Sequence, residues 1–144
     1  MKIIRDILQE KGSEVYSIPP HATVYETLQM MADKNVGALL VMQDDSVVGI
    51  ISERDYARKV VLKGKFSKDV PVSEIMSSHI LRIDPDQDIE TCMELMSDKR
   101  VRHLPVFENG RVVGIISIGD IVKAIIEHKE ETIAQLENYI RGNR

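Results

Sequence analysis

The hexapeptide Val-Val-Gly-Ile-Ile-Ser occurs twice in this 144-residue chain, at Val47–Ser52 and again at Val112–Ser117. The copies lie 65 residues apart, as Ile50 and Ile115 show, and this offset holds over a long stretch without a gap. A repeat of this length predicts two structural units of the same kind. Identical residues pair along the alignment of Ser17–Val60 with Arg82–Ile125, among them Ile18 with Ile83, Pro20 with Pro85, Met31 with Met96, Leu39 with Leu104 and Asp55 with Asp120.

Each copy begins with the same expected elements. A short strand reaches Ile18 or Ile83 and meets a proline turn. In the first copy Thr23 then caps a helix, with Glu26 completing a capping box, and in the second copy Asp88 is the expected cap. Apolar positions at helical spacing follow each cap, which predicts that one face of each helix lies in the core.

Two strands follow in each copy. In the first they are Leu39–Met42 and Val47–Ile51, joined by a polar tetrapeptide. In the second they are Leu104–Phe107 and Val112–Ile116, joined around Asn109-Gly110, which is a strong hairpin signal.

A second helix begins after Ser52 in one copy and after Ser117 in the other. In the second copy we expect it to run to about Ile140. One broad apolar face is predicted along it. That face comprises Ile121, Ala124, Ile125, Ile133, Leu136 and Ile140.

The expected unit is therefore β-α-β-β-α, in the α/β (α+β) class, with both helices on one face of a three-stranded sheet. Two such units can bury their bare sheet faces together around a pseudo-twofold axis. Residues Ile4–Leu8 also resemble Val72–Met76, at a separate offset of 68. We place the first repeat, with its N-terminal helix, at 1–64, a polar connector at 65–71, and the second repeat, with an extended C-terminal helix, at 72–144.

Composition excludes several classes of protein. No window approaches the ~20 apolar residues of a membrane span, and Asp6 and Glu10 within the first ten residues argue against a secretory signal peptide. Cys92 is the only cysteine, so an internal disulfide is impossible and a reducing compartment is expected. The net charge is −4 without a long basic run, which argues against nucleic-acid binding. We expect a cytoplasmic protein, or one of an organelle matrix if a targeting segment has been removed.

The repeated motifs resemble those of the CBS domain family. The resemblance rests on the β-α-β-β-α order, on the segment Arg102–Val106, and on the doubled G-I-I-S-x-x-D at Gly49–Asp55 and Gly114–Asp120. It covers roughly Ile4 to Ile125. It implies a tandem pair of CBS domains, called a Bateman module, of the stand-alone type. It also implies binding of an adenosyl ligand such as AMP, ADP, ATP or NAD, and a homodimer formed through the CBS helices.

The junction from strand to helix carries the chemistry that suits such a ligand. A helix N-terminus presents free N–H groups and the positive end of a dipole, which favours phosphate. The hydroxyls of Ser52 and Ser117 can bond phosphate or ribose, and the carboxylates of Asp55 and Asp120 can accept hydrogen bonds from both ribose hydroxyls. The alternative is a plain S-x-x-D capping box, which needs no ligand.

The resemblance also implies an apolar slot for adenine, lined by the entry strand and the first hairpin strand. Purines suit apolar walls that carry backbone donors, and ordinary core packing is the alternative for each of these positions. The implied lining is Val15, Tyr16, Ser17 and Leu40 for one slot and Ile80, Leu81 and Pro105 for the other.

The two sites should differ. The second copy has Arg102 and His103 where the first has Gly37 and Ala38, and the first has Arg54 where the second has Gly119. Arg102 can hold a phosphate through its planar guanidinium, although a surface ion pair is equally compatible, and His103 can be structural. Leu40 replaces the proline found at Pro105.

These patterns lead to three functional hypotheses. The first is a regulatory module that senses an adenine nucleotide and acts on a partner protein in trans. The second is a structural or interaction protein, a CBS-pair dimer without a physiological nucleotide. The third, a nucleotide-hydrolysing enzyme, lacks a nucleophile–base–orienter set, a Walker loop or a G-x-G-x-x-G motif in the sequence. The four histidines and Cys92 also lack metal-ligand spacing, so no catalytic residue, metal or cofactor is predicted.

Overall fold

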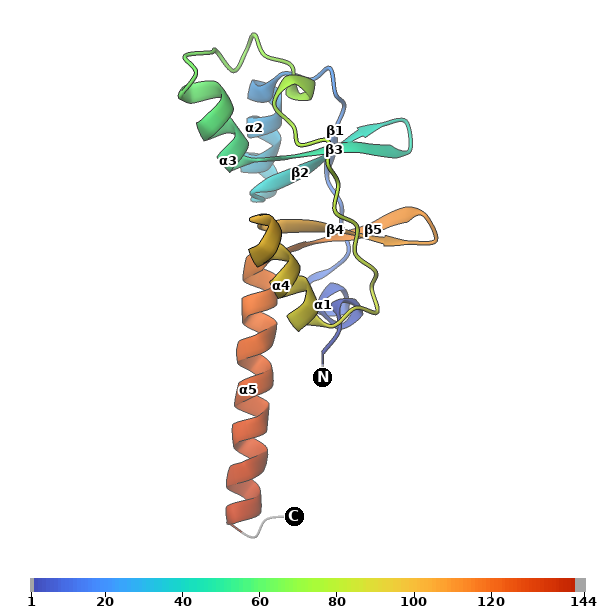
Figure 1. The fold of residues 1–144 in the computed structure, drawn as a ribbon, viewed down its shortest axis with the longest axis vertical. Helices are drawn as coiled ribbons and strands as arrows, with labels where there is room; N and C mark the ends of the chain where they lie inside the picture. Colours follow the sequence, from blue (N-terminus) through green and yellow to red (C-terminus); the bar gives the residue numbers. More distant parts are fainter. Residues whose placement is uncertain (1, 142–144) are drawn as a thin grey trace. The chain divides into compact units, whose positions relative to one another are not determined.

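The computed structural model describes residues 2–141, without the side chain of Tyr139. Twelve elements follow one another in it (Figure 1). They are α1 (Ile4–Lys11), β1 (Ser17–Ile18), α2 (Val24–Lys34), β2 (Ala38–Gln43), β3 (Ser46–Ser52), α3 (Glu53–Tyr56), the π-helix η1 (Ala57–Val61), the 3-10 helix η2 (Val72–Glu74), α4 (Ile89–Lys99), β4 (His103–Glu108), β5 (Arg111–Ser117) and α5 (Ile118–Ile140). The expected order β-α-β-β-α is confirmed in the first copy, an isolated bridge replaces the first strand in the second copy, and α5 ends at Ile140 as the sequence predicts.

The chain forms two compact units whose boundaries differ from those of the sequence repeats. The first unit is Val15–Leu81, and the second unit combines Met1–Glu14 with Arg82–Arg144. Helix α1, which we had placed in the first repeat, belongs to the second unit. Residues 72–81, which we had placed in the second repeat, belong to the first unit. Each unit is therefore completed by the N-terminal segment of the other repeat.

In the first unit, β1, β2 and β3 form one sheet in that order, with β1 parallel to β2 and β2 antiparallel to β3. Its core is aliphatic, and Leu39, Val41 and Ile51 are each at most 1% exposed. Thr23 begins α2 by accepting a hydrogen bond from the N–H of Glu26 at 3.1 Å. The Glu26 carboxylate accepts from the Thr23 hydroxyl, also at 3.1 Å, rather than from the N–H of Thr23. The cap is confirmed, and only the second half of the predicted capping box is wrong.

The second unit repeats this design with one strand fewer. Strands β4 and β5 pair in the register of β2 and β3, with the same irregularity after Val106 as after Val41. The segment equivalent to β1 is reduced to an isolated bridge between Ile83 and Val106. The reason lies at one position: Leu40 donates its N–H to Tyr16 O at 3.3 Å, whereas the equivalent Pro105 has no N–H to donate. The prediction of three strands is correct for the first unit and wrong for the second.

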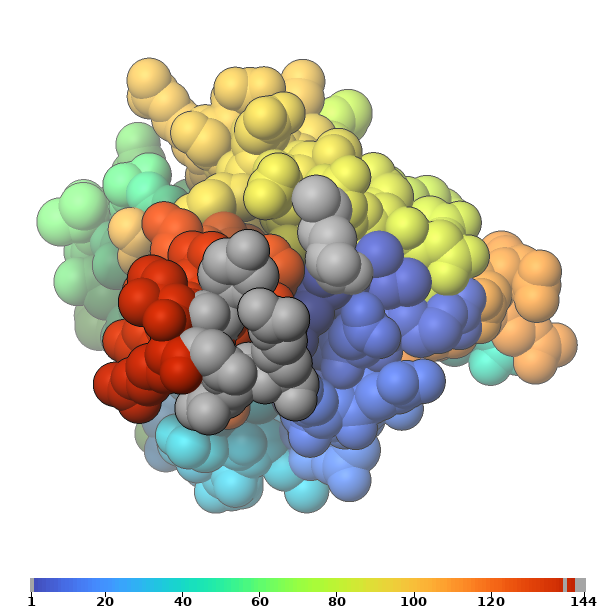
Figure 2. Space-filling view, turned by 90° about the horizontal axis from the view of Figure 1, so that it is seen from below, coloured from blue at the N-terminus to red at the C-terminus, as the bar shows by residue number. Residues whose placement is uncertain are grey.

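Helix α1 packs onto the second unit through its backbone and side chains. The N–H groups of Ile4 and Arg5 donate to Gln87 O at 3.0 Å and to Pro85 O at 2.7 Å. Figure 2 shows α1, in blue, against the yellow-to-gold segment that leads into α4. Leu8 is buried beneath β5, where a side chain on Gly114 would collide with it. The N-terminal helix is thus a structural part of the second unit.

Candidate functional site

In the first unit, the predicted junction lies where β3 passes into α3. Ser52 has an extended backbone, with φ −126° and ψ 166°, and is the N-cap residue. Its N–H donates to Asp55 Oδ2 at 2.9 Å and its hydroxyl donates to the same oxygen at 3.1 Å. The N–H of Glu53 donates to Gly37 O at 3.1 Å, which fixes the start of the helix against β2. Ser52 and Asp55 are therefore brought together, as the motif predicts.

The second unit builds the same junction between β5 and α5. The N–H of Ser117 donates to Asp120 Oδ2 at 2.8 Å, and the N–H of Asp120 donates to Ser117 Oγ at 3.1 Å. The N–H of Ile118 donates to Arg102 O at 2.8 Å, which matches the contact to Gly37 in the first unit. The repeated sequence thus produces a repeated capping geometry.

Sequence reasoning missed a lysine beside each carboxylate. In the first unit, Lys59 Nζ lies 3.0 Å from Asp55 Oδ1 and donates to Ile75 O at 2.8 Å. Lys59 follows Asp55 by four residues on one continuous helical stretch, so the helical spacing could have identified this pair. The Lys59 ammonium group thereby links the junction to residues 72–81, the segment that completes the first unit.

In the second unit the lysine comes from the N-terminal helix. Lys11 Nζ lies 2.8 Å from Asp120 Oδ2 and donates to Ile115 O at 2.9 Å. No local pattern could predict this pair, because it requires α1 to pack on the second unit. Burial opposes ionisation of Asp120, but hydrogen bonds from Lys11 and Ser117 outweigh burial and lower the pKa of its carboxyl below 3.8. Asp120 is therefore ionised at neutral pH.

His103 stands opposite Ser117 on the paired strand, where the first unit has Ala38 opposite Ser52. Burial is the main cause that lowers the pKa of His103 from 6.5. Arg102 and Lys11 lower it further, and Asp120 opposes the shift. The imidazole is accordingly neutral at physiological pH. It adds a polar ring, rather than a positive charge, to the second junction.

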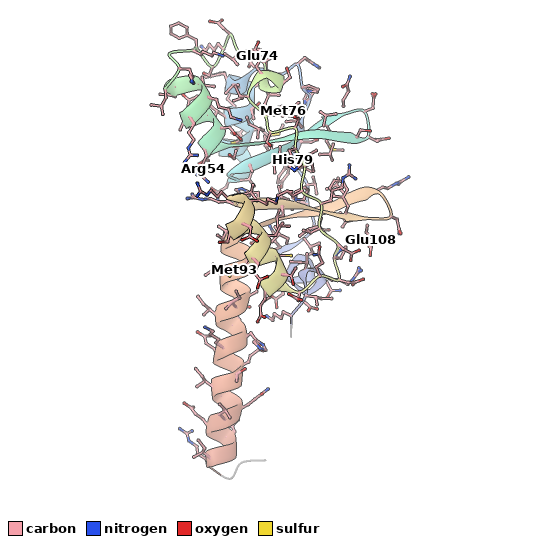
Figure 3. The ribbon with its side chains drawn as sticks, viewed as in Figure 1. Arg54, Glu74, Met76, His79, Met93 and Glu108 are labelled. Atoms are coloured by element: carbon pink, nitrogen blue, oxygen red, sulfur yellow. The ribbon has the colours of Figure 1, made fainter. Side chains whose placement is uncertain are left out.

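The other predicted site residues divide between the units. Tyr16 directly precedes β1, and Ser17 is its first residue. Leu40 is fully buried on β2. Arg54 is a partly buried residue at the start of α3 (Figure 3). The first set, which also includes Val15, lies in one unit. The second set does not: Ile80 and Leu81 belong to the first unit, whereas the exposed Arg102 and the buried Pro105 belong to the second.

Each unit also has a hollow at the hairpin end of its sheet, away from the junction. In the first unit it measures about 450 Å³ and is lined by residues that include Pro20, Gln43 and Ser73. In the second unit it measures about 410 Å³, and the equivalent positions are Pro85, Glu108 and Arg5. A smaller hollow of about 70 Å³ adjoins Lys11, Asp120 and Lys123.

Residues 2–141 contain neither a membrane-spanning helix nor a cluster of metal-ligating side chains. No helix in this range is long and apolar enough to cross a membrane. No three His, Cys, Asp or Glu side chains in it lie close enough together to hold a metal ion.

Comparison with known proteins identifies the family. Residues 4–62 and 72–127 each match the family model described as CBS domain. The mitochondrial CBS domain-containing protein CBSX3 of Arabidopsis thaliana is 34% identical over 148 residues, covering 96% of this chain and 72% of that protein. A solved CBS-domain protein of Burkholderia ambifaria is 43% identical with a TM-score of 0.85, covering 88% of this chain and 95% of that one.

A more distant neighbour was solved with ligands. The CBS domain pair of protein MJ0100, in complex with 5′-methylthioadenosine and S-adenosyl-L-methionine, has a TM-score of 0.79 at 22% identity. The alignment covers 89% of this chain and 98% of that one, and at this identity the likeness concerns the fold alone. The two family matches, the relatives and the repeated β-α-β-β-α units show that this chain belongs to the CBS domain family, as a tandem pair of CBS domains.

Proposed function

We propose that this CBS pair is a regulatory module, not an enzyme, and that it binds an adenine nucleotide of the AMP, ADP, ATP or NAD type. The observation that carries the proposal is the junction built twice, with Ser52 and Asp55 in one unit and Ser117 and Asp120 in the other. Binding would alter the arrangement of the pair and so act on a partner protein in trans.

Each part of the ligand has a chemical counterpart at the junctions. The N–H groups that open α3 and α5 suit a phosphate, and the aspartates suit the two ribose hydroxyls. Lys59 and Lys11 place a positive charge beside each carboxylate. The partly buried Tyr16 supplies apolar surface for an adenine ring in the first unit, whereas Leu40 and Pro105 are buried core residues rather than open walls of a slot.

The fold itself is compatible with such a ligand. The CBS pair of MJ0100 holds two adenosyl compounds within the same fold. The shared fold supports an adenosyl compound as the class of ligand.

The bonding of the two aspartates supports unequal affinity. Asp55 uses both carboxylate oxygens within its own unit, because Ser52 bonds Oδ2 and Lys59 bonds Oδ1. Asp120 receives both Ser117 and Lys11 on Oδ2, and within residues 2–141 no hydrogen bond is found to Oδ1, which is therefore available to a ribose hydroxyl. We therefore propose that the second junction binds the nucleotide more tightly.

One observation favours the structural alternative. Both oxygens of the Asp55 carboxylate are engaged without a ligand, as expected of a capping box whose role is only to start a helix. In that case the chain would be a CBS-pair dimer whose junctions serve folding alone.

A ligand screen separates these possibilities. Protein freed of ligand by unfolding and refolding would be tested by thermal shift with AMP, ATP, NAD and S-adenosylmethionine, and ligand released from natively purified protein would be identified by mass spectrometry. We expect at least one adenine nucleotide to raise the Tm in a saturable way. If no adenosyl compound shifts the Tm and none is released, the structural alternative holds.

Self-association is the second part of the proposal. Large apolar side chains remain exposed on the helices of both units or directly after them, including Val61 and Leu62 in the first and Val122 and Ile126 in the second. We propose that the chain forms a homodimer that buries helical surface of this kind. Light scattering over a range of concentrations tests it, and a monomer throughout would contradict it.

A further inference from the structure

Helix α5 has two apolar faces, although the sequence suggests one broad face. Ile121 and Ala124 are 0% and 4% exposed, and they pack into the second unit. Further along α5, the carboxylate of Glu127 forms an ion pair with Lys2 Nζ, 3.1 Å away, within the same unit. Beyond this point the helix continues past the other elements of its unit (Figures 1 and 3). The predicted single face is therefore wrong, because Ile133, Leu136 and Ile140 do not continue the buried one.

The second face is an exposed apolar stripe with a heptad pattern. At about 100° per residue the stripe falls within a sector of roughly 80°, about a third of a turn from Ile121 and Ala124. Ile126, Ile133 and Ile140 recur every seven residues, and Val122, Lys129 and Leu136 occupy the intervening positions. These are the a and d positions of a coiled coil. The apolar members are exposed to 40% (Val122), 50% (Ile126), 55% (Ile133), 57% (Leu136) and 81% (Ile140).

We propose that this stripe pairs with α5 of a second copy of the chain, in the antiparallel orientation. The inference rests on the proposed self-association and is independent of nucleotide binding. A helical segment of about 13 residues beyond Glu127 is marginal by itself in water. A second copy supplies an apolar stripe of the same length and spacing to cover it.

Lys129 decides the orientation. In a parallel pair, equivalent positions face each other, so Lys129 would meet Lys129 of the second copy inside the seam. In an antiparallel pair, a positions face d positions, and Lys129 lies opposite Ile133 of the second copy. The remaining layers then match Ile126 with Leu136 and Val122 with Ile140. Only the antiparallel arrangement separates the two ammonium groups.

Charges beside the seam favour the same orientation. Lys123, Glu130 and Glu137 occupy the e positions. In an antiparallel pair e positions flank each other, so Lys123 lies near Glu137 of the second copy, twice in the dimer. The two Glu130 side chains repel each other near the centre. In a parallel pair Lys123, Glu130 and Glu137 would instead face the g positions, which are Ile118, Ile125 and Thr132, without any ion pair.

Sedimentation of the full chain tests the pairing. Ile133→Glu/Leu136→Glu places two charges in the stripe, and Ala134→Glu/Asn138→Glu places the same charges on the opposite side of the helix as a control. We expect the stripe variant to dimerise at least 100-fold more weakly than the wild type and the control, with an unchanged Tm in dilute solution. A wild-type monomer would overturn both self-association and this pairing. A dimer that survives the stripe variant would overturn the pairing alone.

Cross-linking tests the orientation. Lys129→Cys and Ile133→Cys would be prepared separately and oxidised alone or after mixing, with buried Cys92 unchanged. The antiparallel pair predicts disulfides chiefly in the mixture, between position 129 of one copy and position 133 of the other. Efficient self-cross-linking of each variant alone, without enrichment in the mixture, would overturn the antiparallel orientation.

Discussion

The junction at Ser52 and Asp55 and the junction at Ser117 and Asp120 share the S-x-x-D motif and the two capping hydrogen bonds that it makes, but they differ in how the lysine reaches them. In the first unit Lys59 lies one helical turn after Asp55. In the second unit Lys11 comes from a helix 109 residues away in the chain. The same carboxylate–ammonium pair has thus been built locally in one unit and by tertiary packing in the other.

This difference shows that the repeated S-x-x-D motif does not determine which residues pack around it. The N-terminal segment of each repeat completes the other unit: α1 packs against β5, and residues 72–77 pack against β3. Since α1 and η2 differ in sequence and length, the junctions they support differ as well. The predictions below change one unit at a time and compare it with the other.

The largest expected effect concerns the two glycines under these segments. A Cβ on Gly49 would overlap Met76 and lie 3.1 Å from the backbone oxygen of Ser77 (Met76 is labelled in Figure 3). A Cβ on Gly114 meets only the flexible end of Leu8. We expect Gly49→Val to destabilise the protein by about 3 kcal/mol and Gly114→Val by about 1–2 kcal/mol. Urea denaturation measures the free energy of unfolding of both variants. Equal losses in the two would contradict the prediction and show that both segments can move aside to the same extent.

The next effect concerns nucleotide affinity. Losing a charged hydrogen bond costs roughly 1.5–3 kcal/mol, or about one to two decades in Kd. We expect Asp120→Ala to remove the tighter binding event and Asp55→Ala to affect only the weaker one, as measured by calorimetry with the preferred nucleotide.

Two results would contradict this ranking of the sites. Glu131→Ala, a change at an exposed position on α5 away from both junctions, is the control and should leave both binding events unchanged. If Asp55→Ala abolished the tighter event and Asp120→Ala did not, the order of the two sites would be reversed. If neither variant changed binding, the ribose role of both residues would be refuted.

A smaller effect distinguishes the two lysines. Lys11→Met removes a group that lowers the pKa of Asp120, so that pKa should rise toward 3.8, whereas Lys59→Met should leave it unchanged. A depressed folded-state pKa stabilises the protein above the unfolded value, and this contribution is lost as pH falls through the folded value. The stability lost in Lys11→Met, about 0.5 kcal/mol for so exposed a pair, should therefore appear at pH 6 and vanish well below pH 3.8. Carboxyl NMR titration of both variants checks the assignment.

The smallest effect concerns His103, which has Ala38 as its counterpart. Burial depresses its pKa below 6.5, so the stability that comes from the neutral ring is complete above 6.5 and is lost as pH falls through the folded value. We expect the Tm of the wild type to fall more between pH 7.5 and pH 5.5 than that of His103→Ala. The control is His128→Ala, a change at an exposed position on α5. An identical pH dependence in wild type and His103→Ala would show that the imidazole titrates freely.

Local patterns explain what the sequence could predict. The caps at Thr23 and Asp88, the two hairpins and the paired Ser–Asp junctions depend on residues within a few positions of one another, and all are found in the structure. Asn109 and Gly110, for example, both have positive φ, as a two-residue hairpin turn requires.

Features that depend on distant segments escaped prediction. The role of Lys11 depends on where α1 packs, and the two faces of α5 depend on which side its own unit covers. The shortened second sheet was within reach of sequence reasoning, because Pro105 lacks the N–H that Leu40 uses. The pairing lost at Pro105 was not predicted, because the family resemblance assigns this proline only to the wall of the ligand slot.

The most direct test of the central claim is a calorimetric titration of ligand-free protein with the nucleotide selected by the ligand screen. It would compare the wild type with Asp55→Ala/Asp120→Ala and with Asp55→Asn/Asp120→Asn, which keeps an oxygen for each serine N–H. We predict two unequal binding events in the wild type and none in either double variant, with the circular dichroism spectrum of the folded protein retained in all three. Undiminished binding in both double variants, or no binding heat in the wild type, would contradict the account.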